Sequence, residues 1–471
     1  MEEKQSAVNN NKLLNIPASH KNIFSCYTPI ILRFLLSGKV EYRNSVKANR
    51  SENHHWRWTA GWTSTKIIIA CILTCFMASL VMDLLDLFGD GPSNEPSYGK
   101  VRNIISMIAY ADTQIVLFRI CVILLFVLLR GKQIIACLNF VIGKTAVGFS
   151  IPGNVLKRYM MLAHALFIIS LIGTLANLAG KLTKPSAYEN FWRLERYGFM
   201  SAPYGVIFFV LHVPVSIGSI LFAPPMIILF AYLTSILHAC AQSIEQQFTA
   251  ILQEIEEVNV ESSVLTVKLK RMREQYESLL EMTQEVQSIF TVKLLADIVT
   301  NVFEILVFTA WLLIWFVVPE GNSVYDCPGK FGVTLVALGN LWMLGGKPLQ
   351  QSAMPGKLAL LVEDFICMRH CQIRKDAPVC VPIENVEKVM LGVASVSSEE
   401  REVCYEFLHR LKTSSLTFHA GDLLELDYGS VLTATFFVFG FFCFVVNQIE
   451  SFVPSTRSLV IDAVNCTATW Q

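Results

Sequence analysis

Seven apolar runs, each long enough to cross a lipid bilayer, constrain this chain more than any other feature. A helix of about 20 apolar residues spans the hydrocarbon core of a membrane, because it rises about 1.5 Å per residue. The runs cover residues 67–88, 104–129, 159–180, 205–237, 289–318, 331–352 and 429–449. The sequence therefore predicts an all-α membrane protein with seven transmembrane helices.

Composition and motifs exclude other classes of protein. Of the 471 residues, 53% are hydrophobic and 16% are charged, whereas soluble domains have about 25% charged residues. The formal net charge of +0 does not indicate the basic surface that binding to nucleic acid requires. The 13 cysteines lie mostly in apolar runs without metal-ligand spacing, so we expect buried thiols and no metal or cofactor. Nucleophile-elbow, Walker A and zinc-protease motifs are missing from the sequence, which argues against an enzyme.

Basic residues orient the predicted spans. Lysines and arginines gather before the first run, after the second and before the fifth, all on the side that the positive-inside rule makes cytoplasmic. The N-terminus is thus predicted in the cytoplasm and the C-terminus outside. A glycosylation sequon at Asn465 is usable in this orientation, and one at Asn49 only in the reverse orientation. Rhodopsin-like receptors have that reverse orientation, and their Asp-Arg-Tyr and Asn-Pro-x-x-Tyr motifs are missing here, so a G-protein-coupled receptor is disfavoured.

The runs divide the chain into seven parts. These are a cytoplasmic N-terminal segment (1–66), transmembrane helices one to four (67–237), a cytoplasmic helical hairpin (238–288), transmembrane helices five and six (289–352), further cytoplasmic helices (353–428), the last transmembrane helix (429–449) and an extracellular tail (450–471). The short apolar stretch 29–36 predicts an interfacial helix in the first part.

Apolar residues recur at heptad-like spacing in the cytoplasmic parts. They are Ile244, Phe248, Ile251 and Ile255 on the way into the hairpin, Leu269, Met272, Tyr276, Leu279 and Val286 on the way back, Leu358, Leu361, Val362 and Phe365 after span six, and Val403, Phe407, Leu408 and Leu411 before the last span. The pattern predicts helices with one apolar seam each. Two arrangements fit it: a hairpin packed on some other surface, or an anchor bundle that joins subunits.

The end of the chain carries a motif. Residues 407–411 (Phe-Leu-His-Arg-Leu) precede residues 418–427 (Phe-His-Ala-Gly-Asp-Leu-Leu-Glu-Leu-Asp), and a hydrophobic helix then closes on Gln448. With seven spans, an inside N-terminus and the long hairpin, this pattern resembles the insect gustatory and odorant chemoreceptor superfamily. It is most similar to the gustatory-receptor signature, although Phe441-Phe442 and Gln448-Ile449 replace the Thr-Tyr and Gln-Phe of that signature.

The resemblance implies a tetrameric, non-selective cation channel in the plasma membrane, opened by a small-molecule tastant and built from identical or related receptors. The last helix would line the pore, with Gln448 as a polar ring and Phe441, Phe444 and Val445 as the apolar gate. A ring of apolar side chains stops ions by dewetting. Without the resemblance, Gln448 could equally reach to the membrane interface. A secondary transporter of a small organic solute and a non-conducting co-receptor subunit are the alternatives.

Aromatic and polar residues in the outer half of the first six spans are the ligand-binding candidates. They are Tyr110, Asp112, Gln114, Asn177, His212, Trp311, Trp315, Asn340 and Trp342. Aromatic walls with a few polar groups suit a neutral organic ligand. Trp311 and Trp315 also fit interfacial anchors, and His212 also fits a packing residue.

Charged residues inside the spans need partners, because an unpaired charge in lipid is costly. Asp112 and Arg119 are seven residues apart and lie on one helical face, and Glu304 has a similar predicted depth. We therefore expect Arg119 to pair with Glu304 or Asp112 and to hold the helix bundle together.

Overall fold

The structure is a computed structural model. It describes residues 38–42, 56–60, 98–149, 202–257, 262–317, 326–373, 398–421 and 423–427, with single residues in 70–77, 161–175 and 429–447. The predicted interfacial helix 29–36 and the glycosylation site Asn465 lie outside the described residues.

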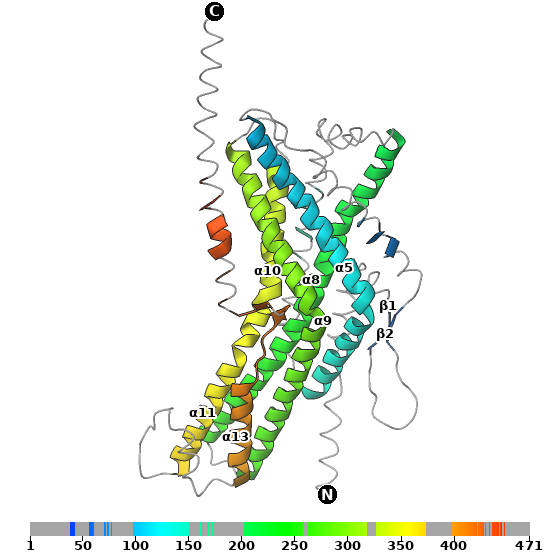
Figure 1. The fold of residues 1–471 in the computed structure, drawn as a ribbon. Coiled ribbons are helices and arrows are strands. Elements are labelled where there is room, and N and C mark those ends of the chain that lie inside the picture. Colours follow the sequence, from blue (N-terminus) through cyan, green and yellow to red (C-terminus); the bar gives the residue numbers. More distant parts are fainter. Residues whose placement is uncertain are drawn as a thin grey trace, which may run out of the picture.

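Long helices form an elongated bundle (Figure 1). They are α5 (Tyr98–Gly148), α8 (Ala202–Glu257), α9 (Ser262–Val317), α10 (Asp326–Ser352), α11 (Met354–Ile373) and α13 (Ser398–Thr413). Helix α9 packs against α5, α8, α10 and α13, so it is the central element of the bundle. Helices α11 and α13 pack together at the lower end of the bundle in Figure 1.

Helices α8 and α9 join predicted membrane and cytoplasmic parts without a break. Each has 56 residues, or about 84 Å at 1.5 Å per residue, far more than a bilayer requires. Helix α5 likewise continues to Gly148, beyond the predicted span end at residue 129. Arg130 and Lys132 are exposed there while Ile134 and Leu138 are buried. The two charges ended the apolar run but not the helix, because the opposite face still packs.

The predicted apolar seams are confirmed as the core of the lower bundle. Their residues on α8, α9, α11 and α13 are buried, with Leu361 partly so. The Phe248 ring of α8 lies 6.1 Å from Phe365 of α11 and 6.4 Å from Phe407 of α13 between centroids. Tyr276 of α9 packs edge-on against Phe407 at 5.9 Å. Four helices of one chain thus meet around these rings.

Of the two arrangements that fit the heptad pattern, this packing matches the hairpin packed on another surface, and an anchor bundle that joins subunits stays a prediction. The seams are filled by the chain's own helices. The reason is that α11 and α13, which follow span six in sequence, fold back onto the hairpin formed by α8 and α9.

Two small antiparallel pairs of strands correct the all-α expectation. Strand β1 (Gly38–Tyr42) pairs with β2 (Trp56–Ala60), and β2 contacts α5. Strand β3 (His419–Ala420) pairs with β4 (Leu424–Glu425). Gly421 begins the β3–β4 turn with φ 63°, a left-handed conformation that glycine adopts at little cost. The chain is otherwise mostly helical where the structure describes it.

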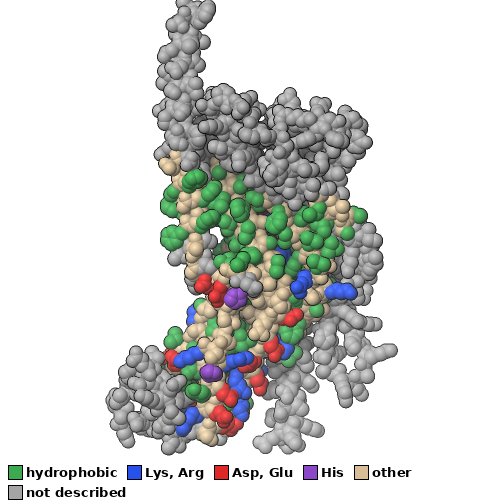
Figure 2. Space-filling view, viewed as in Figure 1, with side chains coloured by type: hydrophobic (Ala, Val, Ile, Leu, Met, Phe, Trp, Pro, Cys, Tyr) green, Lys and Arg blue, Asp and Glu red, His purple; other side chains and the backbone are tan. Residues whose placement is uncertain are grey.

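On the face shown in Figure 2, exposed apolar side chains form a band across the upper half of the described bundle, whereas most charged side chains lie below it. The band includes Phe118 on α5, Phe303 on α9 and Phe331 and Leu338 on α10. Two described helical stretches, Phe118–Thr145 and Met226–Ile255, are long and apolar enough to cross a membrane.

Candidate functional site

A stripe of buried polar residues runs along α9 inside the apolar band. Lys293, Asp297, Asn301 and Glu304 are each at most 6% exposed, and their spacing puts them on one helical face. Lys293 bonds Asp297 one turn away, and the Asn301 side-chain amide donates to the Asp297 carbonyl at 2.6 Å. Because buried charges are costly unless paired, this pairing explains how the stripe is tolerated.

The stripe connects α9 to two neighbouring helices. Arg119 Nη1 of α5 lies 2.9 Å from Glu304 Oε1, and Arg119 Nη2 donates to Asn301 Oδ1 at 3.4 Å. Asn340 Nδ2 of α10 donates to the same Asn301 oxygen at 3.0 Å. Of the two partners considered from the sequence for Arg119, the structure brings Glu304 to it. Asn301 was missed from the sequence, although its i+4 spacing from Asp297 was a usable signal.

The structure separates the other ligand-binding candidates. Asn340 is buried and bonded to Asn301, whereas Trp342 is 50% exposed on α10, because residues two apart point to different sides of a helix. Tyr110, Asp112 and Gln114 are positions on α5, His212 on α8, and Trp311 and Trp315 on α9; the side chains of these six and all of Asn177 lie outside the described residues. Within the described residues no group of His, Cys, Asp and Glu could hold a metal ion.

A second site joins the C-terminal motif to α9. Gln287 Nε2 donates to the His419 carbonyl at 2.7 Å, and the His419 amide donates back to Gln287 Oε1 at 2.9 Å. Thr291 Oγ1 donates to the same carbonyl at 2.9 Å, and the Gly421 amide donates to the Thr291 carbonyl at 3.0 Å. The Gln287 side-chain amide thus bonds both the N–H and the C=O of His419, as the backbone of a neighbouring strand would. We call residues 418–427, seated in this way, the connector.

Two further contacts seat the connector. Phe418 is fully buried and packs edge-on against Phe230 of α8, with centroids 5.6 Å apart. A Cβ on Gly421 would lie 3.0 Å from Leu295 Cδ2, so glycine permits both the backbone conformation and the close approach. The connector leads directly into the last helix, whose starting position is therefore fixed on α9.

Of the predicted gate residues, Gln448 and Val445 lie outside the described residues. Phe441 and Phe444 are described and helical, with ring centroids 6.5 Å apart. Phe444 is 57% exposed, as are Phe436, Phe437 and Phe439 to similar degrees. In a single chain these four phenylalanines of the last helix are therefore exposed, whereas Phe441 is partly buried.

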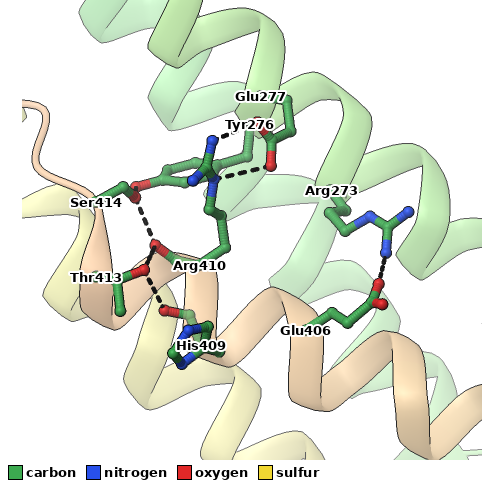
Figure 3. Close-up of polar contacts among 8 residues, drawn as sticks. All are labelled: Arg273, Tyr276, Glu277, Glu406, His409, Arg410, Thr413 and Ser414. Carbon is green, nitrogen blue, oxygen red and sulfur yellow. Dashed lines mark hydrogen bonds and ion pairs between the residues drawn. The ribbon is translucent and has the colours of Figure 1, made fainter.

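Ion pairs hold α13, the helix before the connector, in register with α9 (Figure 3). Lys270 pairs with Glu399. Figure 3 shows the other two pairs, Arg273 with Glu406 and Glu277 with Arg410. Arg410 binds Glu277 through two bonds of 3.0 Å each. The order of charges is plus, plus, minus on α9 and minus, minus, plus on α13. A shift of register would bring like charges together, so the pattern favours one alignment.

An open groove of about 640 Å³ lies over these pairs. Its lining includes Lys144 of α5, Glu274 and Ser278 of α9, and His409 and Thr413 of α13.

Nearby Tyr276 bonds Ser414 at 2.9 Å, and burial raises the pKa of its phenol. The hydrogen bond to Glu277 raises the pKa of Arg410. Burial, and then the Glu400 carboxylate, raise the pKa of the Cys404 thiol to about 12, so this thiol stays protonated and unreactive at neutral pH.

Replacing Gln287 with alanine is expected to loosen the connector without unfolding the bundle. The change removes both bonds to the His419 backbone, worth about 0.5–1.5 kcal/mol each. Hydrogen exchange of the amides in 418–427 should accelerate by about tenfold, because local opening becomes easier. Gln284→Ala, at an exposed position of the same helix, is the matched control. Equal exchange in the two variants would show that Gln287 does not hold the connector.

Comparison with known proteins identifies the architecture. No protein-family model and no curated protein matches the sequence. Among solved structures, the chain is similar to the insect olfactory receptor OR5 from Machilis hrabei in complex with eugenol, with a TM-score of 0.61 and 11% identity over 91% of this chain and 99% of that one. A second structure of the same receptor gives a TM-score of 0.56 and 11% identity over 88% of this chain and 96% of that one. This chain therefore has the fold of the insect chemoreceptors, the superfamily that its C-terminal motif resembles.

Proposed function

We propose that this protein is a gustatory receptor that works as a ligand-gated, non-selective cation channel opened by a small-molecule tastant. The observation that carries the proposal is the likeness over 91% of the chain to an olfactory receptor solved with eugenol. The motif at residues 407–427 and Gln448 favours the gustatory branch, because that branch closes its last helix on a glutamine. A receptor channel of this kind is not an enzyme.

The proposed location is the plasma membrane, with a cytoplasmic N-terminus. The apolar band in Figure 2 supports it, since exposed apolar side chains gather on the upper bundle and most exposed charged side chains lie below them on the face shown. The Arg119–Glu304 pair also supports it, because these residues lie near the middle of the predicted spans 104–129 and 289–318. Charges at that depth are expected to be paired.

The proposed assembly is a homotetramer, or a heterotetramer with related receptors, around a pore lined by the last helix. The uncovered phenylalanines of that helix, Phe436, Phe437, Phe439 and Phe444, support this arrangement, because contiguous exposed apolar side chains mark contact surfaces. Gln448 would form the polar ring beside a gate of Phe441, Phe444 and Val445. The ligand would bind in the outer half of the helix bundle.

Whole-cell recording from cells that express this chain alone tests the proposal. We expect a cation current when a panel of sugars, bitter compounds and eugenol is applied. Gln448→Ala should change the conductance or ion selectivity of that current at least severalfold, because the amide ring sits where ions shed water. Asn447→Ala, at the adjacent position, is the matched control.

Three outcomes would count against the proposal. Uptake of a small solute without current would indicate a secondary transporter. Current that appears only with a second receptor, and that Gln448→Ala leaves unchanged, would indicate a non-conducting co-receptor subunit. A surface-expressed chain without current under any ligand of the panel, alone or with related receptors, would reject the channel.

A further inference from the structure

Two lysines where α10 meets α11 differ from five basic residues of α9 and α13. On α9 and α13, Lys268, Lys270, Arg273, Arg410 and Lys412 each pair with a carboxylate. Lys347 and Lys357 make no ion pair among the residues that the structure describes; Lys347 bonds the neutral Gln350 amide at 2.9 Å. Within the described part of the chain, their positive charge is therefore not balanced by a carboxylate at ion-pair distance.

A buried histidine lies beside the same two lysines. His238 of α8 is 5% exposed, and its Nδ1 has no hydrogen-bond partner among the described residues. Lys347 and Lys357 are the charged groups that act on this ring. Helix α8 packs against both α10 and α11, so polar groups from three helices gather at one junction. An unsatisfied buried polar atom costs free energy, and when Nδ1 carries the ring proton an acceptor from outside the chain would offset that cost.

The depth of this junction matches the inner face of a membrane. Asn340, bonded in the network near the middle of the spans, precedes Lys347 by seven residues (347 − 340), or about 10 Å along the helix. The hydrocarbon core extends about 15 Å from the bilayer centre, and a lysine side chain reaches several ångströms further to the headgroups.

We propose that the junction of α8, α10 and α11 binds the phosphate of an anionic phospholipid from the cytoplasmic leaflet. Lys347 and Lys357 provide the ammonium donors, and His238 Nδ1 lies at the same junction. Basic pockets between helices at the cytoplasmic side of a membrane commonly take acidic headgroups. The site rests on the proposed membrane placement and is separate from the ligand-binding candidates in the outer half.

Full-length protein reconstituted into nanodiscs tests the site. One set contains phosphatidylcholine alone, and another contains phosphatidylcholine and phosphatidylserine in equal parts. We expect native mass spectrometry to show phosphatidylserine retained on the wild type. In the double variant Lys347→Gln with Lys357→Gln, the amount of retained lipid should fall by about fivefold for each lysine removed. The matched control is Arg130→Gln with Lys132→Gln, which removes two exposed cations from α5 and should retain the lipid. Lys347→Arg with Lys357→Arg should also retain it.

The outcomes separate the site from the function. Failure of the chain to enter nanodiscs would contradict the proposed membrane placement itself. A chain that enters them but retains phosphatidylserine equally with and without the two lysines would overturn the lipid site alone. Uptake of inorganic phosphate in phosphatidylcholine nanodiscs, with the same dependence on both lysines, would identify a soluble-anion site and also overturn the lipid assignment.

Discussion

Arg119→Ala is expected to destabilise the protein by about 3–5 kcal/mol, because Glu304 would remain buried without its cation. Both side chains are 8% exposed and the pair is 2.9 Å apart. Arg119 also bonds Asn301, so the change disturbs the contact with α10 as well. We expect a large loss of cell-surface protein and a lower unfolding temperature in detergent micelles.

The reciprocal variant separates charge pairing from side-chain volume. Arg119→Glu combined with Glu304→Arg should recover part of the surface expression that each single change removes. Arg130→Ala is the control on the same helix, since Arg130 is exposed and bonds Gln133 at 2.7 Å; its effect should stay within about 0.5 kcal/mol. Unchanged expression of Arg119→Ala would mean that the pair does not stabilise the bundle.

Phe418→Ala is expected to cost about 3–5 kcal/mol, as is usual for a phenylalanine removed from a packed core. The ring is fully buried against Phe230, and it seats the connector from which the last helix starts. Because α13 keeps its ion pairs with α9, the lower bundle should remain folded. We expect tryptic cleavage after Lys412 to accelerate and any ligand-gated current to fall strongly.

Leu423→Ala is the control for that experiment. Leu423 lies in the same connector and is 83% exposed, so its removal should change stability by less than about 0.5 kcal/mol. If both variants behave alike, the buried ring does not position the connector. If Phe418→Ala unfolds the whole protein, far-UV circular dichroism will reveal it, and the connector is then part of the global core.

The connector illustrates what sequence patterns leave undetermined. Gly421 in a small-residue turn was recognisable as part of a motif, but nothing local in the sequence links it to Thr291 or links His419 to Gln287. These bonds join positions more than a hundred residues apart. They form only after α13 has been placed on α9, so only tertiary packing could bring them together.

The buried polar stripe could be predicted from the sequence only in part. Depth in the predicted spans was enough to favour Arg119 with Glu304, because an unpaired charge in a membrane is so costly that few partners qualify. Depth alone could not choose between Glu304 and Asp112. It also did not reveal that Asn301 would bond both Arg119 and Asn340, since helix rotation decides which side chains face each other.

The sequence by itself determined the helical class, the apolar seams and the chemoreceptor resemblance. Periodicity and hydrophobic length are local properties, and burial of one face of each helix follows from them whatever the partner. The tertiary structure decided which faces meet: the seams of α8, α9, α11 and α13 close on one another within one chain, and α9 links the buried Arg119 network to the connector. Such choices depend on helix rotation, register and chain return, which only the packed whole specifies.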